Sequence, residues 1–159
     1  MMKHVLILLW MLMGMSLAQQ PASPKPPLGV PADAKLFNGK WYAVILDKAD
    51  WQAAQSRCKQ KGGQLVCIHD KATSDFITSL TKLRVWLGAT DEKVDGKWVW
   101  VDGKEMTFTN WAKGDPSNTQ GRETCLRTGA GGLWSDTPKS WDAYAEFQVV
   151  GYICEWKAR

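Results

Sequence analysis

The sequence predicts a disulfide-stapled α+β domain in which two helices precede most of a set of short antiparallel strands. Apolar residues recur at helical spacing in two segments, 50–61 and 73–80. Asn-Gly and Asp-Gly pairs, which favour tight turns, interrupt or flank short apolar runs at 36–44 and 97–101. Two helices followed by several short strands are typical of a single mixed domain.

A hairpin is predicted where this domain begins. Leu36 and Phe37 precede the pair Asn38-Gly39, and a second apolar run covers 40–44. Asn and Gly tolerate the positive φ angles that a two-residue turn requires. The pair is therefore expected to join two antiparallel strands.

The first predicted helix covers 50–61. Trp51, Ala54 and Cys58 recur on one of its faces, and Gly62 follows as a stop signal. This face is expected to be buried, which places Cys58 inside the domain.

The second predicted helix begins near residue 73, with Thr73 or Ser74 as its cap. Phe76, Ile77 and Leu80 then share a face. Four short apolar runs predict the strands that follow, at 85–88, 97–101, 125–127 and 151–156.

The chain begins with a predicted secretory leader, 1–18, which has a basic start, an apolar run and small residues at its end. The apolar run is shorter than the ~20 residues that cross a bilayer, so no membrane span is predicted. The Pro-rich segment 19–35 is expected to be an extended spacer, and the domain to occupy 36–159. The protein is expected to be secreted or periplasmic.

The charge argues against nucleic acid as a partner. Removing Lys3 with the leader lowers the formal net charge from +4 to +3, which is too small for a nucleic-acid-binding surface. Basic and acidic residues also alternate along the chain. No nucleic-acid partner is predicted.

The sequence predicts no enzyme. It carries no glycine-rich phosphate loop and no nucleophile motif. His4 leaves with the leader, and His69 is interpreted as a buried or surface histidine without a Cys or carboxylate partner in a metal or triad pattern.

Four cysteines in an exported chain predict disulfides. They are Cys58, Cys67, Cys125 and Cys154, and they permit three pairings. The cysteine count alone does not choose among the pairings.

Oxygen-bearing side chains recur in the segment 111–136 at a spacing that suits a hard cation. They belong to Asp115, Ser117, Glu123, Ser135 and Asp136. Ca²⁺ takes six to eight oxygen ligands, preferably including several carboxylates. The segment is therefore a candidate calcium loop, and the alternative is a solvated surface loop whose acids lie near basic residues.

This order of residues resembles the calcium loop of C-type lectins, which has an acid, a proline and an amide, then a Glu two before a Cys, then Trp-Asn-Asp. The resemblance extends from Lys40 to Trp156. Its other marks are Trp51-Gln-Ala-Ala, Cys58, Gly62-Gly63-Gln-Leu65-Val66, Trp86-Leu87-Gly88-Ala89, Asn110-Trp111 and Ile153-Cys154-Glu155-Trp156. It implies a C-type lectin-like fold.

The resemblance also implies a secreted carbohydrate-binding module. Ca²⁺ held by the five loop residues would bridge to vicinal hydroxyls of a sugar or glycoprotein, with Asp115, Ser117, Glu123 and Ser135 touching the sugar as well. Ser117 and Ser135 stand where the family has amides, and a hydroxyl is shorter and offers fewer hydrogen bonds. Calcium is therefore expected to bind weakly, at about 10⁻⁴ to 10⁻³ M.

The family has an auxiliary calcium position as well. The matching residues are Asp91, Asp95, Asn118 and the shared Glu123, with Thr124 where a further acid would be. The competing interpretation is that Asp91 and Asp95 support a turn.

The resemblance selects Cys58–Cys154 as the bridge between the first helix and the last strand. The family's usual partner for Cys125 is missing, because this chain has Lys139 at that place. Cys67 and Cys125 therefore either pair with each other or remain two buried thiols.

An alternative function keeps the same fold and needs no metal. Trp141, Tyr144 and Phe147 lie in a segment longer than the family usually has before its last strand, and could form an exposed aromatic surface for a protein or glycan. Packing of Trp141 over the extended loop is the competing interpretation. Binding through Trp141 would survive a chelator, whereas binding through calcium would not.

Overall fold

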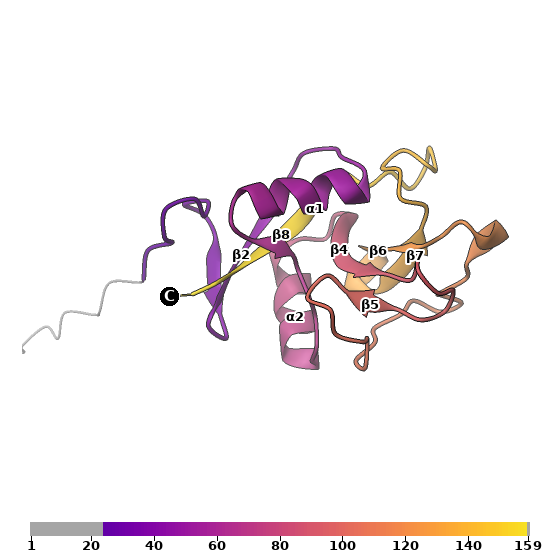
Figure 1. Cartoon of the computed structure of the whole chain (residues 1–159), viewed down its shortest axis with the longest axis horizontal. Helices are drawn as coiled ribbons and strands as arrows, with labels where there is room; N and C mark the ends of the chain where they lie inside the picture. Colours follow the sequence, from indigo (N-terminus) through magenta and orange to yellow (C-terminus); the bar gives the residue numbers. More distant parts are fainter. Residues whose placement is uncertain (1–23, 159) are drawn as a thin grey trace, which may run out of the picture.

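The computed structural model describes residues 24–158 (Figure 1). The predicted leader, 1–18, and the start of the predicted spacer lie outside this range. The described end of the spacer contacts the domain, because Ala34 is buried in a core cluster and Val30 packs against the same cluster.

The predicted hairpin is confirmed. Strand β1 (Lys35–Phe37) pairs antiparallel with β2 (Lys40–Ile45), with Leu36 opposite Trp41. Asn38 and Gly39 form the turn with φ angles of 44° and 72°, as the Asn-Gly pair predicts.

The first helix, α1 (Trp51–Gln60), lies where it was predicted. Trp51, Ala54 and Cys58 are buried on its inner face. Cys58 bonds to Cys154 in the last strand, β8 (Gly151–Lys157), with the two Cα atoms 5.7 Å apart. The disulfide that the resemblance selects is therefore present and ties α1 to the sheet.

The second helix, α2 (Lys71–Leu80), begins earlier than predicted. Its cap is Asp70, whose Oδ1 accepts a hydrogen bond from the Thr73 backbone amide at 2.7 Å. Thr73 and Ser74 are buried inside the helix. The prediction that one of them is the cap was wrong, because an Asp three residues upstream satisfies the same backbone donor.

The central strand of the sheet is β8, which pairs antiparallel with β2 and parallel with β4 (Val85–Thr90). The sheet continues from β4 through β6 to β7. One short strand pairs with β8, and another short strand pairs with β4. These remaining strands are β3 (Gln64–Leu65), β5 (Val99–Trp100), β6 (Cys125–Thr128) and β7 (Trp134–Thr137). Strand β7 was not predicted, although it carries Ser135 and Asp136.

Tryptophans are the largest side chains in the core. Trp86, Trp100 and Trp134 are almost completely buried, and Trp100 and Trp134 pack edge to face at 5.7 Å between ring centroids. The indole nitrogen of Trp86 donates to the Ala49 carbonyl at 2.7 Å, and that of Trp51 donates to the Leu87 carbonyl at 2.8 Å. These bonds satisfy buried polar atoms while fixing α1 against β4.

In the structure Cys67 and Cys125 are both free and buried, as in the second of the two interpretations. Burial raises the pKa of each thiol to about 12. Within 24–158, no helix is both long and apolar enough to cross a membrane.

Candidate functional site

The candidate calcium loop lies at the end of the molecule opposite the described N-terminal residues (Figure 1). Its Asp115–Pro116 peptide bond is cis, and the short 3₁₀ helix η1 (Thr119–Gly121) forms its tip. Behind the loop, β6 and β7 run antiparallel and hold Cys125 opposite Thr137. The acids before β6 and within β7 therefore come to lie beside the loop.

Glu123 is buried, and both of its carboxylate oxygens accept hydrogen bonds from the protein. Its Oε2 accepts from the Ser117 hydroxyl and from the Thr119 backbone amide, each at 2.7 Å. Its Oε1 accepts from the Tyr144 hydroxyl at 2.7 Å. Burial by itself would raise the pKa of Glu123, but hydrogen bonds from Ser117, Tyr144 and Thr119 outweigh it and hold the pKa below its ordinary value.

Asp136 is satisfied in the same way by the backbone of the loop. Its Oδ1 accepts from the Ser117 amide at 3.0 Å, and its Oδ2 accepts from the Asn118 amide at 2.6 Å. Burial nevertheless raises the pKa of Asp136, assisted by the charge of Glu123. Asp136 therefore serves as a backbone clamp that holds residues 117 and 118 against β7.

The other two loop ligands expected from the sequence differ from each other in exposure. Asp115 is half-buried at the cis bond. Ser135 is buried in β7 opposite Arg127, and a Cβ added at Gly129 would lie 3.0 Å from its hydroxyl oxygen. The Ser135 hydroxyl therefore lies close to the backbone of Gly129.

Sequence reasoning missed the buried guanidinium of Arg127. Its pKa is lowered by burial and by Arg84, whereas the charges of Asp115, Glu123 and Asp136 act in the opposite direction. The cation of Arg127 thus balances part of the negative charge that was expected to attract calcium. An Arg in a short apolar strand gives no signal of this role in the sequence.

These contacts test whether calcium suits the loop. All four carboxylate oxygens of Glu123 and Asp136 already accept hydrogen bonds from the protein. A calcium ion would compete with these donors and with the charge of Arg127 for the same oxygens. Of the five residues expected to hold calcium, Asp115, Ser117, Glu123, Ser135 and Asp136, the two acids Glu123 and Asp136 already use part of their lone pairs within the protein. Calcium at this loop would share those oxygens with the loop's own donors.

The auxiliary position fits a cation better. Asp91 Oδ2 accepts from the Gly96 amide at 2.9 Å, and Asp95 Oδ1 accepts from the Asn118 side chain at 2.6 Å. Asp91 Oδ1 and Asn118 Oδ1 are buried and have no hydrogen-bond partner among the residues the structure describes. Two unpaired buried oxygens are costly, and a bound cation would satisfy them.

The long segment between β7 and β8 does not form one aromatic surface. Trp141 is half-buried against the core cluster of the disulfide, with the Lys48 ammonium 4.7 Å from its ring centroid. Tyr144 turns toward Glu123, and Phe147 lies beneath the Arg84 guanidinium. Trp141 therefore packs against the core, and part of its side chain remains exposed.

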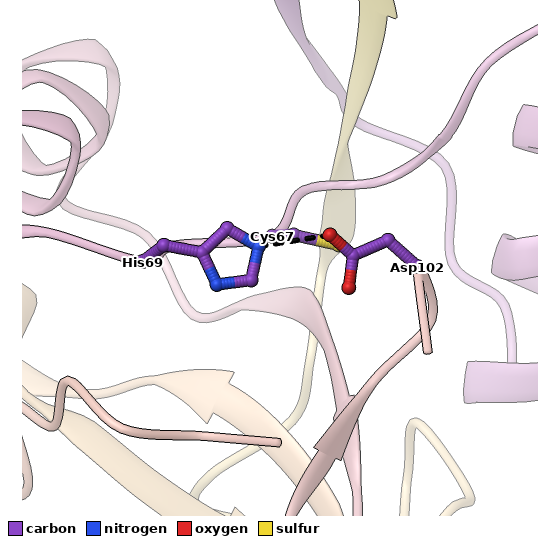
Figure 2. Close-up of side chains that lie close together, drawn as sticks. All are labelled: Cys67, His69 and Asp102. Atoms are coloured by element: carbon purple, nitrogen blue, oxygen red, sulfur yellow. Dashed lines mark hydrogen bonds and ion pairs between the residues drawn. The ribbon is translucent and has the colours of Figure 1, made fainter. Parts of the chain in front are cut away.

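His69 lies beside a carboxylate and a thiol, contrary to the interpretation of the sequence. Its Nε2 lies 2.9 Å from Asp102 Oδ2, and the Cys67 thiol lies beside this pair (Figure 2). The interpretation was wrong because Asp102 is 33 residues away along the chain and reaches His69 only through the turn after β5. The short Cys-x-His spacing was the signal available in the sequence.

The fold and the loop define a disulfide-stapled α+β binding domain of a known kind. Residues 47–156 match the family described as "Lectin C-type domain", which is well over half of the chain. The chain belongs to the C-type lectin domain family, whose members are non-enzymatic binding domains.

Three proteins illustrate the similarity. The chain is 32% identical to the hepatic lectin of Gallus gallus over 122 residues, which cover 75% of this chain and 56% of that protein. It superimposes on the mouse scavenger receptor C-type lectin carbohydrate-recognition domain with a TM-score of 0.72 and 28% identity, covering 82% and 98% of the two chains. For a calcium-independent type II antifreeze protein, the TM-score is 0.71 and the identity 25%, covering 82% and 95%.

The chain spans about half the length of the curated relatives it matches. The matched family includes carbohydrate-recognition domains and antifreeze proteins, and both calcium-dependent and calcium-independent structures occur among the neighbours.

Proposed function

We propose that this domain is a carbohydrate- or glycoprotein-binding module of an exported protein. Ligand binding does not require a calcium ion held by Glu123 and Asp136. The ligand surface consists of the loop 115–123 and the adjoining segment 138–148. One observation carries the proposal: Tyr144, Ser117 and Thr119 together occupy both oxygens of Glu123. The charge of that acid is therefore used to join the two segments.

The surface has chemistry suited to a hydroxyl-rich ligand. Ser117 is exposed, and its hydroxyl lies 3.1 Å from that of Thr119, so the two present a pair of adjacent donors and acceptors. The exposed part of the Trp141 side chain adds apolar surface to the segment 138–148, with the Lys48 ammonium over its ring. Tyr144 connects these two regions through Glu123.

The test is glycan binding by the oxidised protein on an array, in millimolar calcium and again in chelator. The same glycans should bind in both buffers. Ser117→Ala should weaken binding roughly two- to tenfold, as the loss of one hydrogen bond does. Ser56→Ala, an exposed hydroxyl on α1, is the matched control and should bind as the unaltered protein does. Binding that disappears in chelator would refute the proposal, and so would the absence of binding in both buffers.

A second candidate is binding that depends on calcium at the auxiliary position. The unpaired oxygens of Asp91 and Asn118 favour it, since a cation there would fix the turn 91–96 against the loop. Calcium should then raise the melting temperature of the protein, and Asp91→Asn should abolish the rise. Glu92→Gln, an exposed neighbour, should keep it. Identical melts in calcium and chelator would eliminate this candidate.

A further inference from the structure

A sulfur, a nitrogen and an oxygen donor come together outside the candidate calcium loop. The ligand atoms of Cys67, His69 and Asp102 all lie within 4.8 Å of one another. Within residues 24–158, this is the one group of three or more His, Cys, Asp or Glu side chains that meets this condition. In Figure 2, the imidazole and the carboxylate point toward each other, and the sulfur lies beside the line that joins them.

The surrounding structure holds each donor in place. The Cys67 thiol is fixed from both sides, since Gln64 Nε2 lies 3.4 Å from its sulfur and the thiol lies 3.7 Å from the Leu65 carbonyl. Asp102 Oδ1 accepts from the Lys104 amide at 3.1 Å. The His69 ring packs edge to face on Trp100, with 5.7 Å between centroids. The three donors are therefore positioned before any ion arrives.

We propose that Cys67, His69 and Asp102 form a Zn²⁺ site. Zn²⁺ binds thiolate, imidazole and carboxylate at about 2.0 to 2.3 Å, and sites with three protein ligands leave a fourth position for water. Donor atoms already within 4.8 Å of one another need only small side-chain rotations to reach such a tetrahedron. The mixture of soft and hard donors excludes Ca²⁺ and Mg²⁺, which take oxygen ligands.

The charges and the access route agree with a dication. Zn²⁺ would displace the proton of the Cys67 thiol to solvent, and the resulting thiolate and the Asp102 carboxylate would neutralise the ion. The exposed Lys104 ammonium, 3.6 Å from Asp102 Oδ2, would have to move away, whereas the nearby Glu155 is already paired with Lys40 at 2.9 Å. The side chains of His69 and Asp102 remain 28% and 19% exposed, so an ion reaches them from solvent although Cys67 is buried. A cavity of about 130 Å³ lined by Cys67 and His69 opens beside them and has room for the water ligand.

Outer contacts strengthen the assignment. Gln64 donates to Glu155 at 2.9 Å while its amide faces the Cys67 sulfur, an arrangement that orients a metal-bound thiolate. The competing explanation is a simple pair in which His69 and Asp102 close the turn after β5 against the segment before α2. The two explanations differ in the role of Cys67, because a simple pair does not need the sulfur.

The experiment uses the oxidised protein without a polyhistidine tag, stripped of metal by dialysis against chelator. Co²⁺ serves as a spectroscopic probe for Zn²⁺, and Zn²⁺ affinity follows from competition with a chromophoric chelator. One Co²⁺ per chain should give the sulfur-to-cobalt charge-transfer band and the intense visible bands of a tetrahedral site. Zn²⁺ should displace the Co²⁺ and remove both.

Three variants make the result specific. Cys67→Ser should abolish the charge-transfer band, whereas Cys125→Ser, the other buried free thiol, should keep it. His69→Ala changes a partly exposed side chain and tests the site even if Cys67→Ser does not fold. It should weaken Zn²⁺ binding by more than about 100-fold, beyond the loss that outer-sphere changes cause. Absence of the charge-transfer band in the unaltered protein, or its loss in Cys125→Ser alone, would overturn the site.

Discussion

The Tyr144 hydroxyl donates a hydrogen bond to Glu123 Oε1 at 2.7 Å, which joins the segment between β7 and β8 to the candidate calcium loop. Burial and the contact with Glu123 raise the pKa of Tyr144 to about 12, so the hydroxyl keeps its proton at neutral pH. In the C-type lectin resemblance, the same Glu123 is a calcium ligand. In this chain, the Tyr144 hydroxyl from a neighbouring segment donates a hydrogen bond to one of the two carboxylate oxygens of Glu123.

Tyr144→Phe is therefore expected to favour calcium. The variant removes the donor and leaves Glu123 Oε1 free for a cation. A hydrogen bond to a charged group is worth about 1.5 kcal/mol or more, which corresponds to roughly a tenfold gain in calcium affinity. Calorimetric titration of the two proteins with calcium measures the difference.

Ser140→Ala is the matched control for this titration. Its hydroxyl lies in the same segment and bonds to the exposed Asp142, away from Glu123. Calcium affinity should be unchanged in this variant. Equal calcium affinities in Tyr144→Phe and the unaltered protein would show that the hydrogen bond from Tyr144 does not weaken calcium binding by Glu123.

The two free thiols should be unreactive in the folded protein. Cys67 and Cys125 are buried with pKa values raised to about 12, so little thiolate exists at neutral pH. Alkylation followed by mass spectrometry should label neither residue in native buffer. After unfolding without reductant, it should label both. Two unlabelled cysteines after unfolding would mean that Cys67 and Cys125 are bonded to each other.

Loss of the Cys58–Cys154 disulfide should be severely destabilising. The bonded residues are 96 positions apart, so the bond restricts most of the unfolded domain. The chain-entropy account gives about 4 to 5 kcal/mol for a loop of this length. Urea unfolding of the Cys58→Ser, Cys154→Ser double variant should show this decrease in the free energy of unfolding. A decrease below about 1 kcal/mol would contradict it.

Loss of the α2 cap should lower the free energy of unfolding by less than loss of the disulfide does. Asp70→Ala removes the acceptor for the Thr73 amide and should lower the free energy of unfolding by about 1 kcal/mol. Asp70→Asn retains a side-chain oxygen and should lie close to the unaltered protein. If the two variants were equally destabilised, the cap would not be the cause.

Local chemistry explains which elements the sequence could predict. The hairpin follows from Asn38-Gly39, and α1 from the spacing of Trp51, Ala54 and Cys58. Strand β7 could not be found in this way, because Trp134–Thr137 is short, buried throughout and without polar alternation. Its pairing with β6 supplies the pattern that the segment itself lacks.

The sites illustrate the same limit. The family spacing located Glu123 and Asp136 correctly beside one loop, but spacing carries no information on what else donates to them. Tyr144 reaches Glu123 from 21 residues away, and Asp102 reaches His69 from 33 residues away. Contacts between residues so far apart in the sequence depend on the order of the strands in the sheet, and this order is known only from the folded structure.

The two described ends of the chain lie on the side of the molecule opposite the proposed ligand surface. Residues 24–34 and the end of β8 lie on one side of the molecule, where the Ala158 amide bonds to the Gly39 carbonyl at 2.8 Å (Figure 1). Helix η1 and the segment 138–148 lie at the far side. A protein anchored to a biosensor chip through either described end would present both segments to the flowing analyte. The geometry thus permits binding measurements on an oriented monolayer, without chemical coupling through the lysines that lie near the loop.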